Sequence, residues 1–249
     1  MNGFRRTAGD VVRGLGHLLW PGLCMNCRER MPEAGSGLCG ECWEKLISVC
    51  GPDYCLRCGR DVSPYAVCDG VCPNCRGEEI HFDGIARAGV YAESLRGMVL
   101  AFKNGQTELD SVLISLADSA LQACSFTSEI DLFVPVPLHW RKRLIRGYNQ
   151  SHLLARGLKH QSARTSADLA RIRYTEAQPT MPTLAARARN VAGAFAVRYR
   201  HPFTGRRVCL VDDVKTTGAT LNECAKTLKE AGAAKVFALV LAVAGQNAG

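Results

Sequence analysis

From residue 81 onward, short apolar runs alternate with stretches in which apolar residues recur every three or four positions. The first pattern is typical of buried strands and the second of amphipathic helices. Strands are predicted over 84–92 (one or two strands), 130–138, 207–214 and 235–243, and helices over 94–105, 109–124, 149–160 and 219–233. This alternation predicts an α/β fold with a mostly parallel sheet and helices on both faces.

Two of the predicted helices carry signals at their ends. Asn149 and Ser151 are both candidate caps for the start of the helix at 149–160. Gly232 closes the helix at 219–233, because glycine readily adopts the left-handed conformation that ends many helices.

The first 20 residues have a helical pattern of their own. Val11, Val12, Leu15, Leu18 and Leu19 follow helical spacing, which predicts a short packing helix within 1–20. No stretch of the chain approaches 18 unbroken apolar residues, so we expect no transmembrane helix and no membrane partner. Polar residues interrupt the apolar core that a secretory signal needs, and we expect a cytoplasmic protein.

The cysteines separate two parts of the chain. Of 13 cysteines, ten lie between Cys24 and Cys75, so we expect a cysteine-rich domain over 21–80 and an α/β domain over 81–249. Eight of the ten form CxxC pairs, which suit the tetrahedral thiolate geometry of zinc: Cys24, Cys27, Cys39, Cys42, Cys55, Cys58, Cys72 and Cys75. Two structural Zn²⁺ ions in tandem ribbons are predicted, with a crossed pairing of first and third pairs as the alternative.

Other uses of CxxC pairs fit this sequence less well. A thioredoxin-like redox motif needs a βαβ context that this segment lacks, and an iron–sulfur cluster is the other alternative. A disulfide framework is not expected in the cytosol. Cys50 and Cys68 stand outside the pairs and are interpreted as incidental thiols, with replacement of a neighbouring ligand as the alternative.

The formal net charge is +8. Such a charge suits a polyanionic partner, either nucleic acid or a polyphosphate, although a basic surface also aids solubility.

The segment VCLVDDVKTTGAT (208–220) reads as a strand, a loop of small residues and the start of a helix. In an open α/β sheet, ligands bind at the carboxyl ends of strands. The backbone around Gly218, the start of the helix and three threonine hydroxyls form a phosphate cradle. Asp212 and Asp213 would repel phosphate, but they can accept hydrogen bonds from a diol. A sugar 5-phosphate is therefore implied; the alternative is an acidic strand end followed by a helix cap.

LVDDVKTTGAT resembles the phosphoribosyl-pyrophosphate (PRPP) motif of type I phosphoribosyltransferases. The resemblance implies that Asp212 and Asp213 hold the ribose 2- and 3-hydroxyls and act as the catalytic pair. It also implies that the 5-phosphate binds to Lys215, Thr216, Thr217, Gly218, Ala219 and Thr220, with Mg²⁺ accompanying PRPP. Lys215 is not fixed by the motif, which leaves its side chain free to point to solvent.

PVPLHWRKRLIRGYNQS, RYTEAQ and RARNVAGAF resemble signature segments of the ComF/GntX family, and the cysteine pairs fit its double zinc ribbon. The resemblance covers nearly the whole chain. It implies a pyrophosphate loop and a mobile hood over 171–193, with these residues at the ligand: Arg141, Arg143, Arg146, Thr175, Gln178, Arg187 and Asn190. A solvated basic turn, or a contact with nucleic-acid phosphates, is the alternative for 139–147.

The stretch PTMPTLAA departs from the family pattern, with Met181 in place of leucine. Lys103 in AFKNG is a weaker candidate for the ligand.

Two functions from different classes follow. The first is a ComF-like, PRPP-binding protein that transfers phosphoribose to a nitrogen acceptor. The second is a binding module that keeps the fold as a sensor or scaffold and engages single-stranded DNA or proteins of the DNA-uptake machinery. The family resemblance implies a link to competence and to DNA uptake or utilisation. A thiol oxidoreductase using CxxC is the third alternative.

Overall fold

The computed structural model describes residues 23–29, 31, 37–51, 53–63, 72–160, 163–175 and 183–245. The helix predicted within 1–20, Cys68, Gln178 and Met181 lie outside the described residues.

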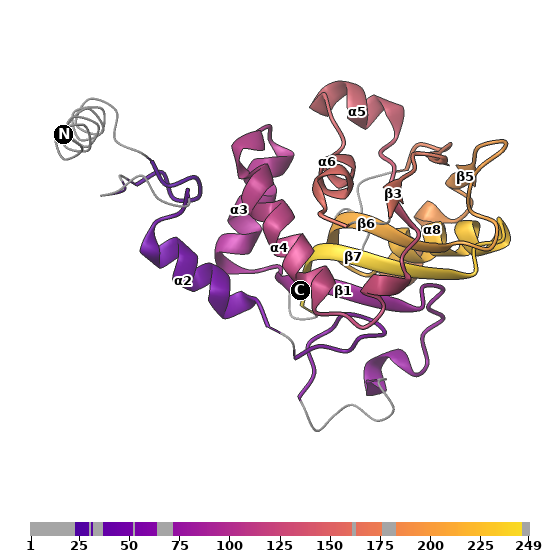
Figure 1. Ribbon diagram of the computed structural model, residues 1–249, viewed down its shortest axis with the longest axis horizontal. Coiled ribbons are helices and arrows are strands. Elements are labelled where there is room, and N and C mark those ends of the chain that lie inside the picture. The colour runs from indigo at the N-terminus through magenta and orange to yellow at the C-terminus, as the bar shows by residue number, and fades with distance from the viewer. Residues whose placement is uncertain are drawn as a thin grey trace, which may run out of the picture.

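A five-stranded parallel sheet forms the centre of the α/β domain (Figure 1). Its strand order is β1 (Gly84–Val90), β7 (Lys235–Val243), β6 (Arg207–Lys215), β2 (Leu132–Pro135) and β3 (Arg164–Thr165). Val211 of β6 pairs with Leu239 on one side and Pro135 on the other. The predicted mostly parallel sheet is confirmed, and the range 84–92 holds one strand, β1.

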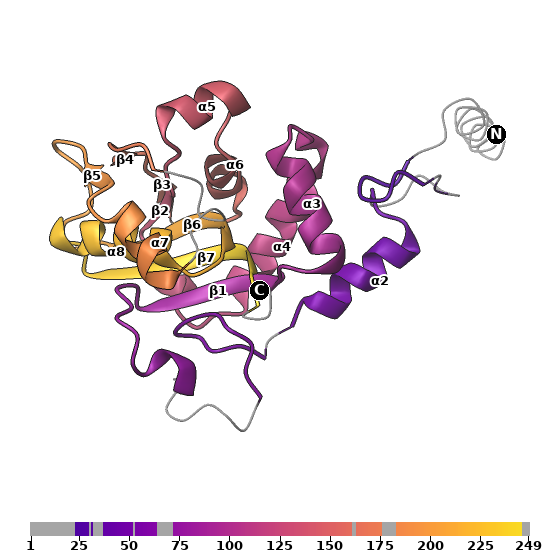
Figure 2. The ribbon, with the colours of Figure 1, turned by 180° about the vertical axis from the view of Figure 1, so that it is seen from behind.

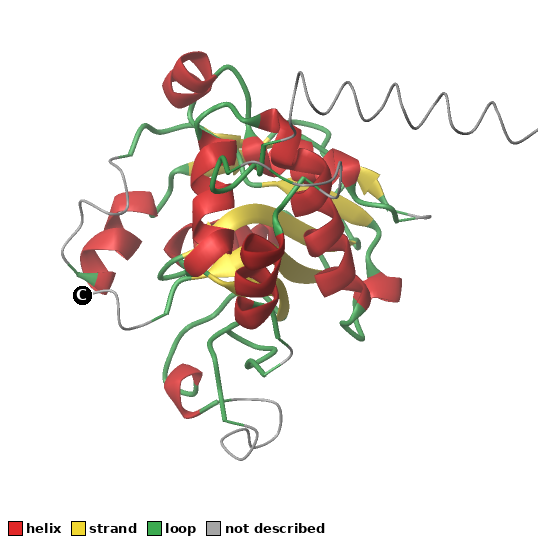
Figure 3. Cartoon of the chain, turned by 90° about the vertical axis from the view of Figure 1, so that its left-hand side faces the viewer, coloured by secondary structure: helices red, strands yellow, loops and turns green. Residues whose placement is uncertain are grey.

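Helices cover both faces of the sheet, as predicted (Figures 2 and 3). One face carries α3 (Glu93–Lys103), α4 (Asp110–Gln122) and α6 (Gln150–Gly157), and the other carries α7 (Leu184–Val191) and α8 (Ala219–Glu230). Along β6, Cys209 and Val211 enter the first core, whereas Val208 and Leu210 enter the second. This alternation follows from the two-residue period of a strand. A small antiparallel pair, β4 (Leu169–Arg171) and β5 (Phe195–Val197), adjoins the second core.

The ends of α6 and α8 follow local sequence signals. Asn149 is the N-cap of α6, since its Oδ1 accepts a hydrogen bond from the backbone N–H of Ser151 at 3.1 Å. Ser151 is therefore not the cap, and its hydroxyl group is available elsewhere. Gly232 follows α8 with a φ of +89°, and its N–H bonds the carbonyl of Lys229, as predicted for a closing glycine.

The basic segment after β2 forms a short helix, α5 (Trp140–Arg146), where a loop or turn was expected. His139 caps its start by accepting the Arg141 N–H, and Gly147 ends it with a φ of +80°. Leu144 and Ile145 are exposed on this helix. The remaining described elements are α2 (Gly40–Val49), η1 (Pro73–Cys75), η2 (Thr107–Leu109) and η3 (Thr127–Glu129). Among the described residues, no helix is long and apolar enough to cross a membrane.

Candidate functional site

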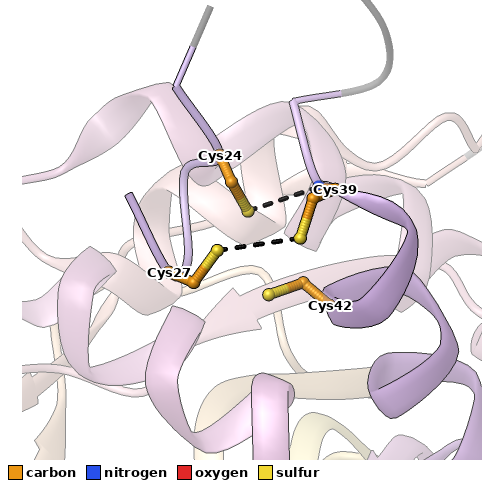
Figure 4. Close-up of side chains that lie close together, drawn as sticks. All are labelled: Cys24, Cys27, Cys39 and Cys42. Carbon is orange, nitrogen blue, oxygen red and sulfur yellow. Dashed lines mark hydrogen bonds between the residues drawn. The ribbon is translucent and has the colours of Figure 1, made fainter. Parts of the chain in front are cut away.

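Eight cysteines of the described residues gather into two clusters of four. The first holds Cys24, Cys27, Cys39 and Cys42 (Figure 4), and the second holds Cys55, Cys58, Cys72 and Cys75. Within each cluster all sulfurs lie within 4.8 Å of one another. Sulfur–sulfur distances of 3.6 to 3.8 Å match the edge of a tetrahedron with Zn–S bonds of about 2.3 Å. The sequential pairing is confirmed over the crossed one, and both clusters fit structural zinc.

The first pair of each cluster folds in the same way. The N–H of Arg28 bonds the carbonyl of Cys24 at 2.9 Å, and the N–H of Gly59 bonds the carbonyl of Cys55 at 2.7 Å. Arg28 and Gly59 both have positive φ angles, 66° and 77°. This left-handed residue after each CxxC turns the backbone so that the two sulfurs face one point. The second pair comes from the start of α2 in one cluster and from η1 in the other.

The four described cysteines outside the clusters lack the environment of a reactive thiol. Burial raises the pKa of Cys50, Cys124 and Cys209, and it raises that of Cys224 with help from the charge of Asp212. A thiol with a raised pKa is a poor nucleophile at neutral pH. These four thiols lie outside the CxxC pairs. The CxxC cysteines on which the thiol oxidoreductase alternative rests lie together in the two clusters, as zinc ligands do.

Asp212 and Asp213 stand at the end of β6 in a dense set of polar contacts. Oδ1 of Asp212 accepts from the Ser151 hydroxyl and from the backbone N–H of Asp213, both at 2.9 Å. The Lys103 ammonium lies 3.1 Å from Oδ2 of Asp213. Burial, together with the charge of Asp213, raises the pKa of Asp212 to about 7. The pair is thus held by neighbours from α3 and α6, which sequence alone places far away.

The loop after the acids borders a cavity of about 240 Å³. Gly218 has a φ of +85°, and a Cβ there would lie 2.8 Å from Cε of Lys215, so the tight turn requires glycine. Tyr91, the residue after β1, and Lys103 of α3 line the same cavity. The full lining is Tyr91, Lys103, Asp212, Val214, Lys215, Thr216, Thr217, Gly218, Ala219, Thr220 and Leu221. All six predicted loop residues therefore meet Asp212 around one space, whereas Asp213 faces Lys103.

Lys215 does not point to solvent, so that alternative for its side chain does not hold. Its side chain folds beneath Gly218, and the residue is 4% exposed. No hydrogen bond or ion pair joins its ammonium to any described residue. Burial, and then the nearby charge of Arg60, lower the pKa of Lys215. The small residues of the loop leave the room that this side chain occupies.

The predicted hood residues lie on two segments joined by hydrogen bonds. Thr175 is buried and its hydroxyl accepts from the guanidinium of Arg171. The Arg173 guanidinium donates to the carbonyls of Asn190 (3.1 Å) and Ala192 (2.6 Å). Arg187 and Asn190 belong to α7. The segment 171–175 and α7 thus hold each other beside the sheet.

The structure does not bring Arg141, Arg143 and Arg146 to the cavity of about 240 Å³. Arg146 bonds Oε1 of Gln150 at 3.3 Å, and Arg141 lies over the ring of Tyr174 in the hood segment.

Two side chains beside Asp212 were missed as site residues. Arg171 interacts with the charge of Asp212, and the Ser151 hydroxyl donates to it. In the sequence, the only signal for Ser151 was its position as a possible cap of the helix at 149–160.

The described residues define the class of protein. It is a zinc-ribbon protein with two four-cysteine clusters, followed by a parallel α/β domain in which paired acids precede a glycine–threonine loop. The double zinc ribbon domain family matches residues 15–76. Competence protein F of Haemophilus influenzae is 32% identical over 220 residues (86% of this chain, 93% of that one), and the DNA utilization protein YhgH of Escherichia coli is 31% identical over 222 (87% and 94%). Competence protein ComFC of Bacillus subtilis is 28% identical over 202 residues (79% and 80%). The chain belongs to the competence protein F (ComF) family.

The chain is also similar to two solved structures. One is a glutamine PRPP amidotransferase from B. subtilis, with 25% identity and a TM-score of 0.32 over 52% of this chain, which spans 26% of that one. The other is a purine phosphoribosyltransferase from Pyrococcus horikoshii, with 18% identity and a TM-score of 0.30, covering 55% of this chain and 73% of that one.

Proposed function

We propose that this protein binds PRPP, accompanied by Mg²⁺, at the end of β6. One observation carries the proposal: Asp212 and the loop from Lys215 to Thr220 border one cavity of about 240 Å³. Backbone N–H groups at a helix start suit a phosphate, and carboxylates suit a diol. A ligand with both groups a few ångströms apart satisfies both halves of the site.

The neighbours of the acids support a role in binding the ribose. The Ser151 hydroxyl and the N–H of Asp213 both donate to Asp212, which orients its second oxygen. Lys103 holds Asp213 and also lines the cavity. When the substrate arrives, a cation in this position can pair with the pyrophosphate, since both lie at the same end of the sheet.

We further propose that the bound PRPP transfers its phosphoribosyl group to a nitrogen nucleophile. The bond from the anomeric carbon to the pyrophosphate oxygen breaks, and pyrophosphate leaves with the electron pair. The nucleophile forms the new C–N bond on the opposite face and then loses its proton to solvent. Asp212 and Asp213 favour the positive charge that builds on the ribose, so the protein acts by positioning and electrostatics.

The hood and helix α5 are proposed to cover the pyrophosphate. Tyr174, in the hood segment, lies against Arg141 of α5 with 5.7 Å between the guanidinium carbon and the ring centroid. A shift of this contact toward the cleft would bring the predicted arginines, Arg141, Arg143 and Arg146, to the leaving group. Arg171 interacts with the charge of Asp212 and is the additional cation in this proposal.

Calorimetry of the zinc-loaded protein with PRPP, with and without Mg²⁺, tests the proposal. The double variant Asp212→Asn with Asp213→Asn should lose Mg²⁺-dependent binding. Asp168→Asn, which changes an acid outside the lining of the cavity, is the control and should bind as wild type does. Equal PRPP affinity in wild type and the double variant would refute the site. Release of pyrophosphate on adding candidate nitrogen acceptors then tests transfer.

A second candidate function is single-stranded DNA binding, in keeping with relatives named as competence and DNA utilization proteins. The favouring observation is a basic and aromatic surface on α5. Arg141 lies over both the Trp140 ring (5.3 Å) and the Tyr174 ring (5.7 Å), and both aromatics are exposed. Exposed aromatic rings with cations stack on bases in a sequence-tolerant way.

Fluorescence anisotropy with a labelled oligonucleotide tests this second function. Trp140→Ala with Tyr174→Ala should weaken binding at least tenfold, and affinity should fall steeply with salt. Tyr199→Ala is the matched control, because exposed Tyr199 also lies against an arginine, Arg200, at 5.5 Å. An equal loss in the control would show that the α5 surface is not the binding surface.

A further inference from the structure

The two cysteine clusters differ in their exposure to solvent. All four cysteines of the second cluster are buried, and none of them is more than 4% exposed. In the first cluster, Cys24 and Cys42 are buried to the same degree, but Cys27 is exposed and Cys39 is partly exposed. The first cluster therefore presents two of its four cysteines to small molecules in solution, whereas the second cluster presents none.

The two accessible cysteines are also neighbours within the cluster. The sulfurs of Cys27 and Cys39 lie 3.7 Å apart (Figure 4). A disulfide bond needs a sulfur–sulfur distance of about 2.05 Å, so a small shift of either side chain brings them to bonding distance. Cys39 is the N-cap residue of α2 and stands at the edge of the regular helix. Joining the two sulfurs therefore does not require a change inside α2.

Zinc binding and exposure together make Cys27 susceptible to oxidation. Bound zinc keeps its cysteine ligands deprotonated, and the thiolate is the form of cysteine that reacts with oxidants. Susceptibility to oxidation follows thiolate character and exposure. Thiolate character is shared by all eight ligands of the two clusters, so exposure decides among them. It singles out Cys27, and it protects the buried second cluster.

We infer that the first cluster is an oxidation site for peroxides, at which Cys27 reacts first and Cys39 closes a disulfide. The Cys27 thiolate attacks one oxygen of hydrogen peroxide, the O–O bond breaks, and the leaving hydroxide takes a proton to become water. The product is a sulfenic acid at Cys27. The Cys39 thiolate then attacks the Cys27 sulfur, the S–O bond breaks, and the second hydroxide also becomes water. The two thiolates lose two electrons in total, and the peroxide gains them.

Oxidation removes the zinc ion and loosens the contact between the zinc ribbon and α3. Only Cys24 and Cys42 remain as thiolate ligands, and two ligands do not satisfy the four-coordinate geometry of a structural zinc site. The turn between the first two cysteines packs tightly on α3, since a Cβ at Gly97 would lie 2.5 Å from Oδ1 of Asn26. Nδ2 of Asn26 also donates to the Cys42 sulfur at 3.3 Å. The inference does not rest on PRPP binding, because no residue of that site takes part.

Hydrogen peroxide treatment of the full-length, zinc-loaded protein tests the inference, with zinc release to a chromophoric chelator and peptide mass spectrometry as readouts. One of the two zinc ions should leave at least tenfold faster than the other, with a disulfide between Cys27 and Cys39. Cys27→His keeps a zinc ligand without the exposed thiolate, so fast release should slow at least tenfold. Cys58→His is the matched control, because Cys58 holds the same place in the buried second cluster, and it should leave the fast release unchanged.

Three results would overturn the inference: equal rates for both zinc ions, a disulfide within the second cluster, or unchanged fast release in Cys27→His. If Cys27→His loads only one zinc ion, the peptide map of the wild-type protein decides. A disulfide between Cys27 and Cys39 in the fast phase then supports the inference, and fast zinc loss without that disulfide overturns it. Dithiothreitol with added zinc should restore the first cluster, because a disulfide is reversible whereas higher oxidation of the thiol is not.

Discussion

Replacing Asp212 by asparagine should stabilise the protein at alkaline pH. Burial and the charge of Asp213 raise the pKa of Asp212 from 3.8 to about 7. The folded state therefore holds the proton more tightly than the unfolded state does. The ionised carboxylate costs stability, the cost begins near the unfolded pKa, and it is complete above the folded pKa. Asparagine removes this cost and can still accept hydrogen bonds from Ser151 and the N–H of Asp213.

The size of the effect follows from the difference in pKa. One pKa unit corresponds to about 1.4 kcal/mol, so the interval from 3.8 to about 7 gives an upper bound of roughly 4 kcal/mol. Asp212 is half-buried, and solvent reduces the penalty, so about 1–3 kcal/mol is expected at pH 8.5. At pH 5.5, between the two pKa values, about half of that gain should persist.

Urea unfolding of the zinc-loaded, ligand-free protein between pH 5.5 and 8.5 measures this difference. Asp131→Asn is the control of opposite sign. Hydrogen bonds from Arg207 lower the pKa of Asp131, so its charged form stabilises the fold above the unfolded pKa. That contribution is lost only as pH falls through the lowered pKa, so the control should be destabilised across the whole range. A loss of stability in Asp212→Asn at pH 8.5 would refute the reasoning.

Three further predictions concern the loop, the second cluster and Lys103. Gly218→Ala and Gly205→Ala should each lower the free energy of unfolding by about 1–2 kcal/mol, because both glycines have a left-handed backbone. Only the new Cβ at Gly218 would contact Lys215, so only Gly218→Ala should weaken PRPP binding in calorimetry. Cys58→Ser should halve the zinc released to a chromophoric chelator from the two clusters; an unchanged amount would contradict the assignment. Lys103→Met should weaken PRPP binding about tenfold, and unchanged calorimetric affinity would remove Lys103 from the site.

Much of the fold could be predicted because its signals are local. The apolar runs over 207–214 and 235–243 form β6 and β7, and the amphipathic pattern over 219–233 forms α8. The sequential cysteine clusters follow from four closely spaced CxxC pairs. In each case, neighbours in the sequence are also neighbours in space.

The parts that failed depend on contacts between distant segments. The orientation of Lys215 is decided by space beneath Gly218 and by the second cluster region, and no local pattern reports either. Arg171 interacts with the charge of Asp212 because β4 packs against the second core, which also holds residues of β6. The helical form of α5 was missed because its apolar residues face solvent, so no apolar periodicity toward a core marks it.

The second cysteine cluster has a structural reason to lie where it does. β1 is an edge strand, and an edge with free backbone groups invites unwanted pairing. The cluster segment covers it: the N–H of Ile85 bonds the carbonyl of Leu56 at 2.9 Å, and the Arg87 guanidinium bonds the carbonyl of Gly59 at 3.0 Å. A Cβ at Gly59 would lie 3.2 Å from Ile85, so the contact is close.

The same docking carries Arg60, the next residue, to the wall of a cavity of about 620 Å³ that Lys215 also lines. A closed four-thiolate site performs no chemistry on a ligand, but it fixes the residues that flank it. Metal loss should therefore expose the β1 edge and displace Arg60 together. Removing the metal therefore cannot separate the effect of the second zinc ribbon on stability from its effect on the position of Arg60.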